Sequence, residues 1–239
     1  METITRKSDL KLILENCSHL YQVNGLNSLM DEVFHQVLSL KIKFPLLEYA
    51  ASYFYELLPQ EQQLPFCDAI ESLNTMGGNV ILGIMLQKRL NEHFEESFQK
   101  AAQYISNSEE WYVSDIIGER VFGYGLLTNP GKALPLIKNY AFHENNMVQR
   151  STGAGMHYAI KKGLKKEFTK PVFELLLSKA SIKDYQAKRG IGWAAKTMSK
   201  FHPDLVNQYL DQIAAKTTGQ WFRTKVNIGL ARHKYAQGN

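Results

Sequence analysis

Apolar residues recur at intervals of three and four along most of the chain, a spacing that places them on one side of an α-helix. The first such segment runs from about Ser8 to Tyr21 and is interrupted at Asn24-Gly25. The same spacing predicts further helices before residue 106, at about 27–40, 45–58, 61–73, 80–90 (capped by Asn79) and 91–104. No segment combines alternating apolar residues with a tight turn, so the pattern predicts an all-α protein.

The segment around Trp111 combines helix signals with candidate chemistry. Ser108 is expected to cap a helix from Trp111 to Leu127, with two glutamates in the first turn, where the helix dipole favours negative charge. Trp111 and Asp115 are four residues apart and therefore share one face of that helix. Two interpretations are open: a core indole beside an aspartate that bonds a neighbouring basic residue, or an aromatic face and a carboxylate of a functional site.

Beyond residue 130 the predicted helices come in pairs, at about 131–140, 146–163, 169 or 171–177, 182–201, 203–215 and 219–235. Three of them open with a comparable element that contains Arg150, Arg189 or Arg223, and these arginines are 39 and 34 residues apart. A drifting repeat of this length, with small residues where helices cross, predicts a HEAT-like-repeat α-solenoid. Such a fold is a right-handed superhelix of antiparallel helix pairs with a concave face.

Charge is distributed unevenly, although the net charge is only +5. Residues 1–130 hold 9 lysines and arginines against 17 acidic residues, whereas residues 131–239 hold 19 against 6. Such a basic excess is typical of a surface that meets a polyanion, nucleic acid first and an anionic membrane second. We therefore expect one domain over residues 1–239, with acidic helices in 1–105 and basic, DNA-facing repeats in 106–239. A merely solvated lysine-rich surface is the alternative.

Equivalent helices of a repeat stack line one concave face, so recurring cations would make that face basic. The cations are Arg150, Lys188 or Arg189, and Arg223 or Lys225, with a further cluster at Lys161, Lys162, Lys165 and Lys166. Cations at regular intervals can contact backbone phosphates, which supply affinity and orientation. DNA is therefore the expected partner.

Other chemistries have little support in the sequence. Cys17 and Cys67 are far apart and the seven histidines do not cluster at ligand spacing, so neither a disulfide framework nor a metal site is expected. Gly123-Tyr124-Gly125 and Gly153-Ala154-Gly155 lack the strand and the third glycine of a dinucleotide-binding loop, and no cofactor is expected. Without a signal-peptide core or an apolar run of about 18 residues, we expect a soluble, cytoplasmic monomer with no membrane partner.

Three motifs together resemble the DNA alkylation repair family, the AlkD-like DNA glycosylases built from HEAT-like repeats. They are Trp111-x-x-x-Asp115, Arg150 within Val148-Gln149-Arg150-Ser151-Thr152-Gly153-Ala154-Gly155, and Trp193 within Gly190-Ile191-Gly192-Trp193-Ala194. The resemblance covers roughly residues 75–235 and is strongest over 105–200. It implies a hydrolase that removes N3- or N7-alkylated purines from duplex DNA and associates with the nucleoid when bound.

The resemblance implies that Asp115, Trp111 and Trp193 are catalytic and that Arg150 holds a phosphate beside the lesion. An alkylated purine is positively charged and leaves readily, and a fixed carboxylate stabilises the oxocarbenium-like sugar that remains. Aromatic faces also favour cations. The resemblance further implies little or no base pocket, whereas most glycosylases extrude the base into one.

Two other functions stay open. Some relatives with this architecture bind duplex or branched DNA without excising bases, so the Trp111/Asp115 pair could belong to a non-catalytic binder. A HEAT-like stack can also be a scaffold for protein partners. Base release separates the enzyme from the binder, and DNA binding separates both from the scaffold.

Overall fold

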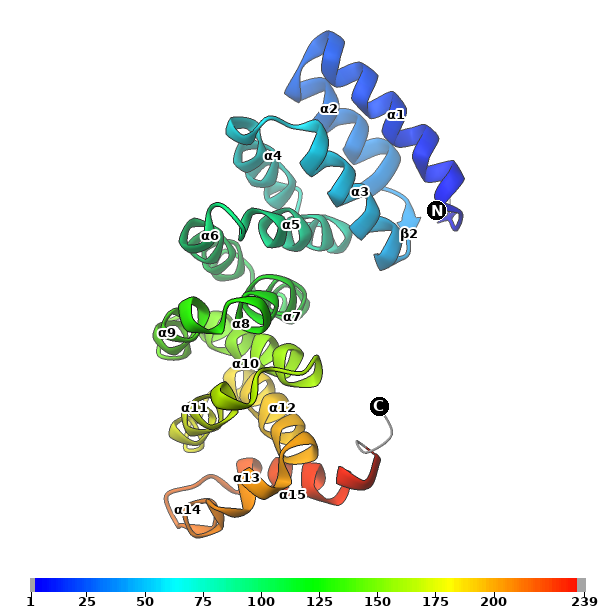
Figure 1. The fold of residues 1–239 in the computed structure, drawn as a ribbon. Coiled ribbons are helices and arrows are strands. Elements are labelled where there is room, and N and C mark those ends of the chain that lie inside the picture. The colour runs from blue at the N-terminus through cyan, green and yellow to red at the C-terminus, as the bar shows by residue number, and fades with distance from the viewer. Residues whose placement is uncertain (1–2, 236–239) are drawn as a thin grey trace. The chain divides into compact units, whose positions relative to one another are not determined.

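The computed structural model describes residues 3–235, and helices account for most of them (Figure 1). Among these residues, extended structure is confined to a parallel pair of short strands, Thr3–Ile4 (β1) and Lys41–Ile42 (β2). Two residues are too few to show an alternating pattern, which is why the sequence did not reveal them. The prediction of an all-α protein is confirmed. The chain divides into two compact units, Met1–His93 and Phe94–Asn239.

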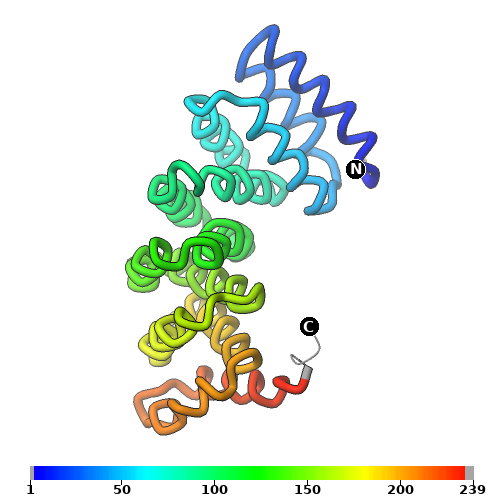
Figure 2. Tube along the Cα trace, in the orientation of Figure 1, coloured from blue at the N-terminus to red at the C-terminus, as the bar shows by residue number. Residues whose placement is uncertain are grey.

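The first unit is a group of helices around a core of phenylalanines and leucines. Its helices are α1 (Lys7–Asn24), α2 (Leu26–Val33), a π-helical turn η1 (Phe34–Leu38), α3 (Phe44–Leu57), α4 (Gln60–Ser72) and α5 (Met76–Arg89). Phe54 and Phe66 are fully buried with ring centroids 5.2 Å apart. Helix α3 packs between α1 and α5, and the course of the chain can be followed in Figure 2.

The start of α5 differs from the prediction. Asn79 does not cap this helix, because α5 begins at Met76 and the hydroxyl of Thr75 accepts a hydrogen bond from the Gly78 amide at 3.0 Å. The Asn79 side chain instead donates to the Thr75 carbonyl at 2.9 Å. A Cβ on Gly78 would lie 2.8 Å from the Thr75 hydroxyl and 3.1 Å from the Ile70 side chain, so this position has little room for a side chain.

The second unit is built from two rows of helices whose members alternate along the chain, as Figure 1 shows. One row contains α6 (Phe94–Ser106), α9 (Pro130–Ala141), α11 (Lys166–Ser178), α13 (Pro203–Asn207) and α14 (Leu210–Ala214). The other contains α7 (Trp111–Ile117), the π-helical turn η2 (Gly118–Gly123), α8 (Tyr124–Thr128), α10 (Asn146–Lys161), α12 (Tyr185–Phe201) and α15 (Gln220–Ala231), followed by the 3-10 turn η3 (His233–Tyr235). Alternating rows of paired helices confirm the prediction of a HEAT-like repeat fold.

The beginning of α7 also differs from the prediction. Ser108 is not the N-cap, since that position is Glu110, and the Ser108 hydroxyl accepts a hydrogen bond from the Glu110 amide at 3.1 Å. The two glutamates therefore precede the helix. Trp111 becomes its first residue, which explains the exposure of the indole described below.

Candidate functional site

Asp115 forms a two-pronged ion pair with Arg150. The Nε atom of Arg150 donates to Oδ1 of Asp115 at 2.9 Å, and its Nη2 atom donates to Oδ2 at 2.7 Å. The side chain of Asp115 is 17% exposed and that of Arg150 is 9% exposed, so the pair is largely shielded from solvent. Charge-assisted bonds in this geometry fix both planes, and the carboxylate is therefore held in one orientation.

Arg150 also joins α7 to α12. Its Nη1 atom donates to the Gln186 side-chain oxygen at 2.7 Å, and its guanidinium carbon lies 5.3 Å from the centre of the Trp111 ring. An arginine has five N–H donors, of which three serve these bonds to Asp115 and Gln186. Among the described residues the remaining two N–H groups have no hydrogen-bonded partner.

The crossing of α10 and α12 depends on two glycines. A Cβ on Gly153 would lie 2.1 Å from the carbonyl carbon of Gly190, and a Cβ on Gly190 would lie 2.1 Å from the carbonyl oxygen of Arg150. Because neither residue carries a side chain, the two backbones touch. This contact brings Arg150 within reach of Gln186.

Two indoles and the ion pair line one cavity of about 280 Å³. Trp111 is 53% exposed and is therefore not a core indole, whereas the other part of that interpretation, an aspartate bonded to a neighbouring basic residue, is what the structure shows. The residues that line this cavity are Trp111, Asp115, Arg150, Arg189, Trp193, Lys196 and Lys225. Asp115 is the single acidic member of this set, so the cavity is strongly cationic around one fixed carboxylate.

Trp193 is held by residues that the sequence did not single out for this role. Its ring stacks on His157, with centroids 3.9 Å apart and planes 22° from parallel. The Nδ1 atom of His157 is 2.6 Å from the Thr197 hydroxyl, which donates to the Trp193 carbonyl at 3.0 Å. Burial, and then the nearby Lys161 and Lys196, lower the pKa of His157 to about 4. The imidazole is therefore neutral at physiological pH.

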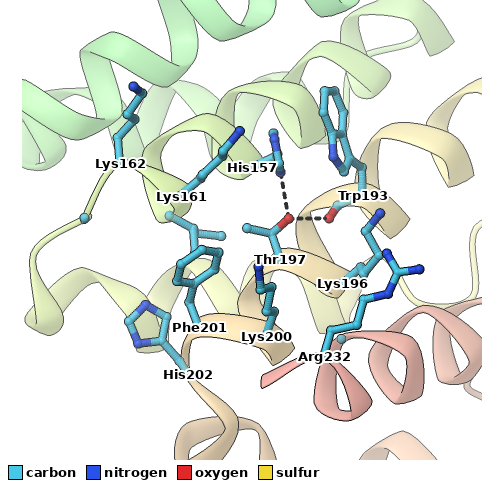
Figure 3. Close-up of a pocket in the computed structure, with 13 residues that line it drawn as sticks. His157, Lys161, Lys162, Trp193, Lys196, Thr197, Lys200, Phe201, His202 and Arg232 are labelled. Carbon is cyan, nitrogen blue, oxygen red and sulfur yellow. Dashed lines mark hydrogen bonds between the residues drawn. The ribbon is translucent and has the colours of Figure 1, made fainter. Parts of the chain in front are cut away.

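A second, larger cavity of about 650 Å³ shares Trp193 and Lys196 with the first. Lys161 and Lys162, which the sequence analysis assigned to a basic cluster, line this larger cavity (Figure 3). Its presence beside the ion pair is a feature that no local motif revealed. Sequence position alone could not have indicated Lys196 as the residue common to both cavities.

Two of the other predicted cations, Lys188 and Arg223, line neither cavity. The guanidinium of Arg223 donates to the carbonyls of Ala214 and Ala215, at 3.5 and 3.1 Å. It therefore closes the carboxyl end of α14, and Lys225 is the cation of this segment that reaches the smaller cavity.

Residues 3–235 contain neither a metal-ligand cluster nor a membrane-spanning helix. No group of three or more histidine, cysteine, aspartate or glutamate residues there could hold a metal ion. No helix in the same range is long and apolar enough to cross a lipid bilayer.

Fold and site together define a helical-repeat protein with a cationic, aromatic cavity around one carboxylate. The chain belongs to the DNA alkylation repair enzyme family, whose sequence model matches residues 42–224. That match includes every residue of the smaller cavity except Lys225, which lies just beyond its end.

Solved structures agree on the fold. The crystal structure of AlkD2 from Streptococcus mutans is 15% identical, with a TM-score of 0.68 over 84% of this chain and 95% of that one. The crystal structure of smu.31 from Streptococcus mutans UA159 is 14% identical, with a TM-score of 0.63 over 91% of this chain and 97% of that one. At such low identity these similarities concern the fold alone. A search of curated proteins gave no significant match.

Proposed function

We propose that this protein is a DNA glycosylase that hydrolyses the N-glycosidic bond of N3- or N7-alkylated purines. The observation that carries the proposal is the position of the Asp115 carboxylate, fixed by Arg150 in a cavity with two indole walls. Membership of the DNA alkylation repair enzyme family supports the same substrate class.

Cleavage of the N-glycosidic bond of an alkylated purine requires little proton transfer. The alkylated base already carries positive charge and leaves without protonation, so the barrier depends on the developing sugar cation. A preorganised negative charge stabilises such a cation without reorganisation. Because both oxygens of Asp115 accept bonds from Arg150, its main role here is electrostatic, with the remaining lone pairs available to orient the attacking water.

Trp111 and Trp193 would supply the aromatic faces, and the surrounding cations would supply the phosphate contacts. The exposed half of Trp111 offers its ring to a cationic base or to the sugar. Arg189, Lys196 and Lys225 surround the same cavity and can neutralise backbone phosphates. Arg150 would add a phosphate contact through its remaining N–H groups.

The test is release of 7-methylguanine or 3-methyladenine from methylated duplex DNA, measured by chromatography. Asp115→Asn should lower the rate by at least about a hundredfold, because it removes the fixed charge on which the transition state depends. Binding of unmethylated duplex should change little. Asp204→Asn, a matched change at an exposed aspartate of α13, should release base at the wild-type rate.

One observation favours a second candidate, a DNA-binding protein without base excision. The ion pair also has a structural function, because it ties α7 to α10 and, through Gln186, to α12. Wild-type protein that binds duplex or branched DNA but releases no base would support this binder. An Asp115→Asn variant with undiminished release would contradict the assigned role of the carboxylate.

A further inference from the structure

The larger cavity concentrates positive charge between the carboxyl-terminal halves of α10 and α12 and the end of α15 (Figure 3). Five cations line it: Lys161, Lys162, Lys196, Lys200 and Arg232. No aspartate or glutamate is among its lining residues. Within residues 3–235, none of the five forms an ion pair.

This charge is not compensated locally. Burial lowers the pKa of Lys196, and the nearby charges of Lys225 and Arg232 lower it further. Burial and Lys166 likewise lower the pKa of His202, another lining residue. Burial raises the pKa of Glu119, and Lys161 is close enough to oppose that rise, but this glutamate does not line the cavity. A bound polyanion would relieve the repulsion.

The cavity also has an aromatic and apolar wall, formed by Trp193, Phe201 and Ile160. Its volume of about 650 Å³ is within the range of roughly 300–1,000 Å³ that holds a small organic molecule. Aromatic faces beside cations are the surface on which unpaired nucleic-acid bases stack. Bases in an intact duplex already stack on their neighbours and do not offer a free face.

The shared wall favours a strand over a free nucleotide. Trp193 and Lys196 line both cavities, so the larger one opens directly beside Asp115 and Arg150. Further cations continue in the smaller cavity, at Arg189 and Lys225. A mononucleotide would leave this continuation unused, whereas a strand would place successive phosphates along it.

We infer that the larger cavity binds one unpaired nucleotide of a DNA strand, with its base against Phe201 and its phosphates on the surrounding lysines. The inference rests on the DNA-binding part of the proposed function. It adds a preference for DNA with an unpaired nucleotide, such as a single-stranded tail, over a blunt duplex.

The test compares two unalkylated fluorescent probes by anisotropy, a blunt duplex and the same duplex with a single-stranded tail. Lys200→Gln should weaken binding of the tailed probe roughly tenfold and lower the slope of log K against log salt by about 0.7, the value for one contact to a single strand. Phe201→Leu should also weaken binding of the tailed probe, by roughly fivefold or more, through lost stacking. The blunt duplex should change less than about twofold with either variant, because it places no nucleotide in the cavity.

Matched controls are Lys138→Gln and Phe142→Leu, exposed residues that do not line the cavity. They should leave the preference for the tail intact. Thermal melts of all four variants identify any that fails to fold, and the lysine variant tests the inference independently of the aromatic one. Equal weakening of both probes, or no weakening, would overturn the inference. So would free dTMP that competes as well as the tailed DNA, or wild-type protein that binds neither probe.

The readout is independent of catalysis. Both probes are unalkylated, so their binding is measured without any base release. A tail preference without base release would refute the glycosylase and leave the nucleotide site standing. Base release without a preference for the tailed probe would support the glycosylase and refute the nucleotide site.

Discussion

Gly153→Ala is expected to destabilise the second unit and to disturb the candidate site at a distance. The new methyl group would lie 2.1 Å from the carbonyl carbon of Gly190, 2.3 Å from its oxygen and 2.5 Å from the Ile191 nitrogen, where ordinary contacts begin at 3.4 Å. These are backbone atoms of α12, which cannot rotate away as the end of a side chain can. The helices must therefore move apart.

The magnitude follows from two opposing contributions. Overpacking against a rigid backbone costs about 3 kcal/mol, whereas alanine gains about 1 kcal/mol over glycine in a helix interior. The net loss of about 2 kcal/mol corresponds to a fall in Tm of roughly 4–8 °C for a chain of this length. Separation of α10 from α12 should also weaken the hydrogen bond from Arg150 to Gln186 and reduce base release.

The assay is thermal unfolding followed by circular dichroism. Gly131→Ala is the matched control, because a methyl group in the first turn of α9 meets no atom within 4 Å. That variant should melt at or slightly above the wild-type temperature. A Gly153→Ala protein as stable as Gly131→Ala would refute the conclusion that the two backbones touch.

Two further predictions concern titratable groups. The pKa of His157 is lowered from 6.5 to about 4, first by burial and then by Lys161 and Lys196, so the unfolded chain binds this proton more readily. The contribution of the neutral His157 to the free energy of unfolding is therefore fully present above pH 6.5. It falls by about 3 kcal/mol as the pH is lowered towards 4. Urea titrations at pH 7 and pH 4.5 should show a smaller loss in His157→Gln, and an equal loss would contradict the assignment. Burial, and then Glu32, raise the pKa of Cys17 to about 12, so at pH 8 its thiol should react with a disulfide reagent only after unfolding. Rapid labelling of the native Cys67→Ser variant would disprove this.

Local patterns in the sequence predicted the helical segments and pairs within one helix, but not every helix boundary, and the predicted helix 203–215 is two helices, α13 and α14. Trp111 and Asp115 lie one turn apart and line the same cavity because a four-residue spacing places them on one face. The start of α5 was missed because glycine has a low helix propensity and Gly77 and Gly78 fall in the first turn, directly after the Thr75 cap. Whether the two units act as one domain, and the handedness and concave basic face of the stack, stay predictions.

Contacts between distant residues could not be read from spacing. The ion pair joins residues 35 positions apart, and the bond between His157 and Thr197 joins residues 40 apart. The regular spacing of the arginines along the chain also did not predict what each arginine contacts. Arg150 and Arg223 occupy comparable places in the repeat, yet one pairs with Asp115 and the other bonds to main-chain carbonyls of α14.

The division into two units has a spectroscopic consequence, because all three tryptophans, Trp111, Trp193 and Trp221, belong to the second. Selectively excited indole emission therefore reports on that unit alone, whereas the far-ultraviolet dichroism signal sums the helices of both. In one denaturant titration, coincident curves would indicate a single cooperative body, and separated curves would indicate two bodies that melt independently. The second unit, which contains the candidate site, therefore also contains the tryptophans whose fluorescence reports its unfolding.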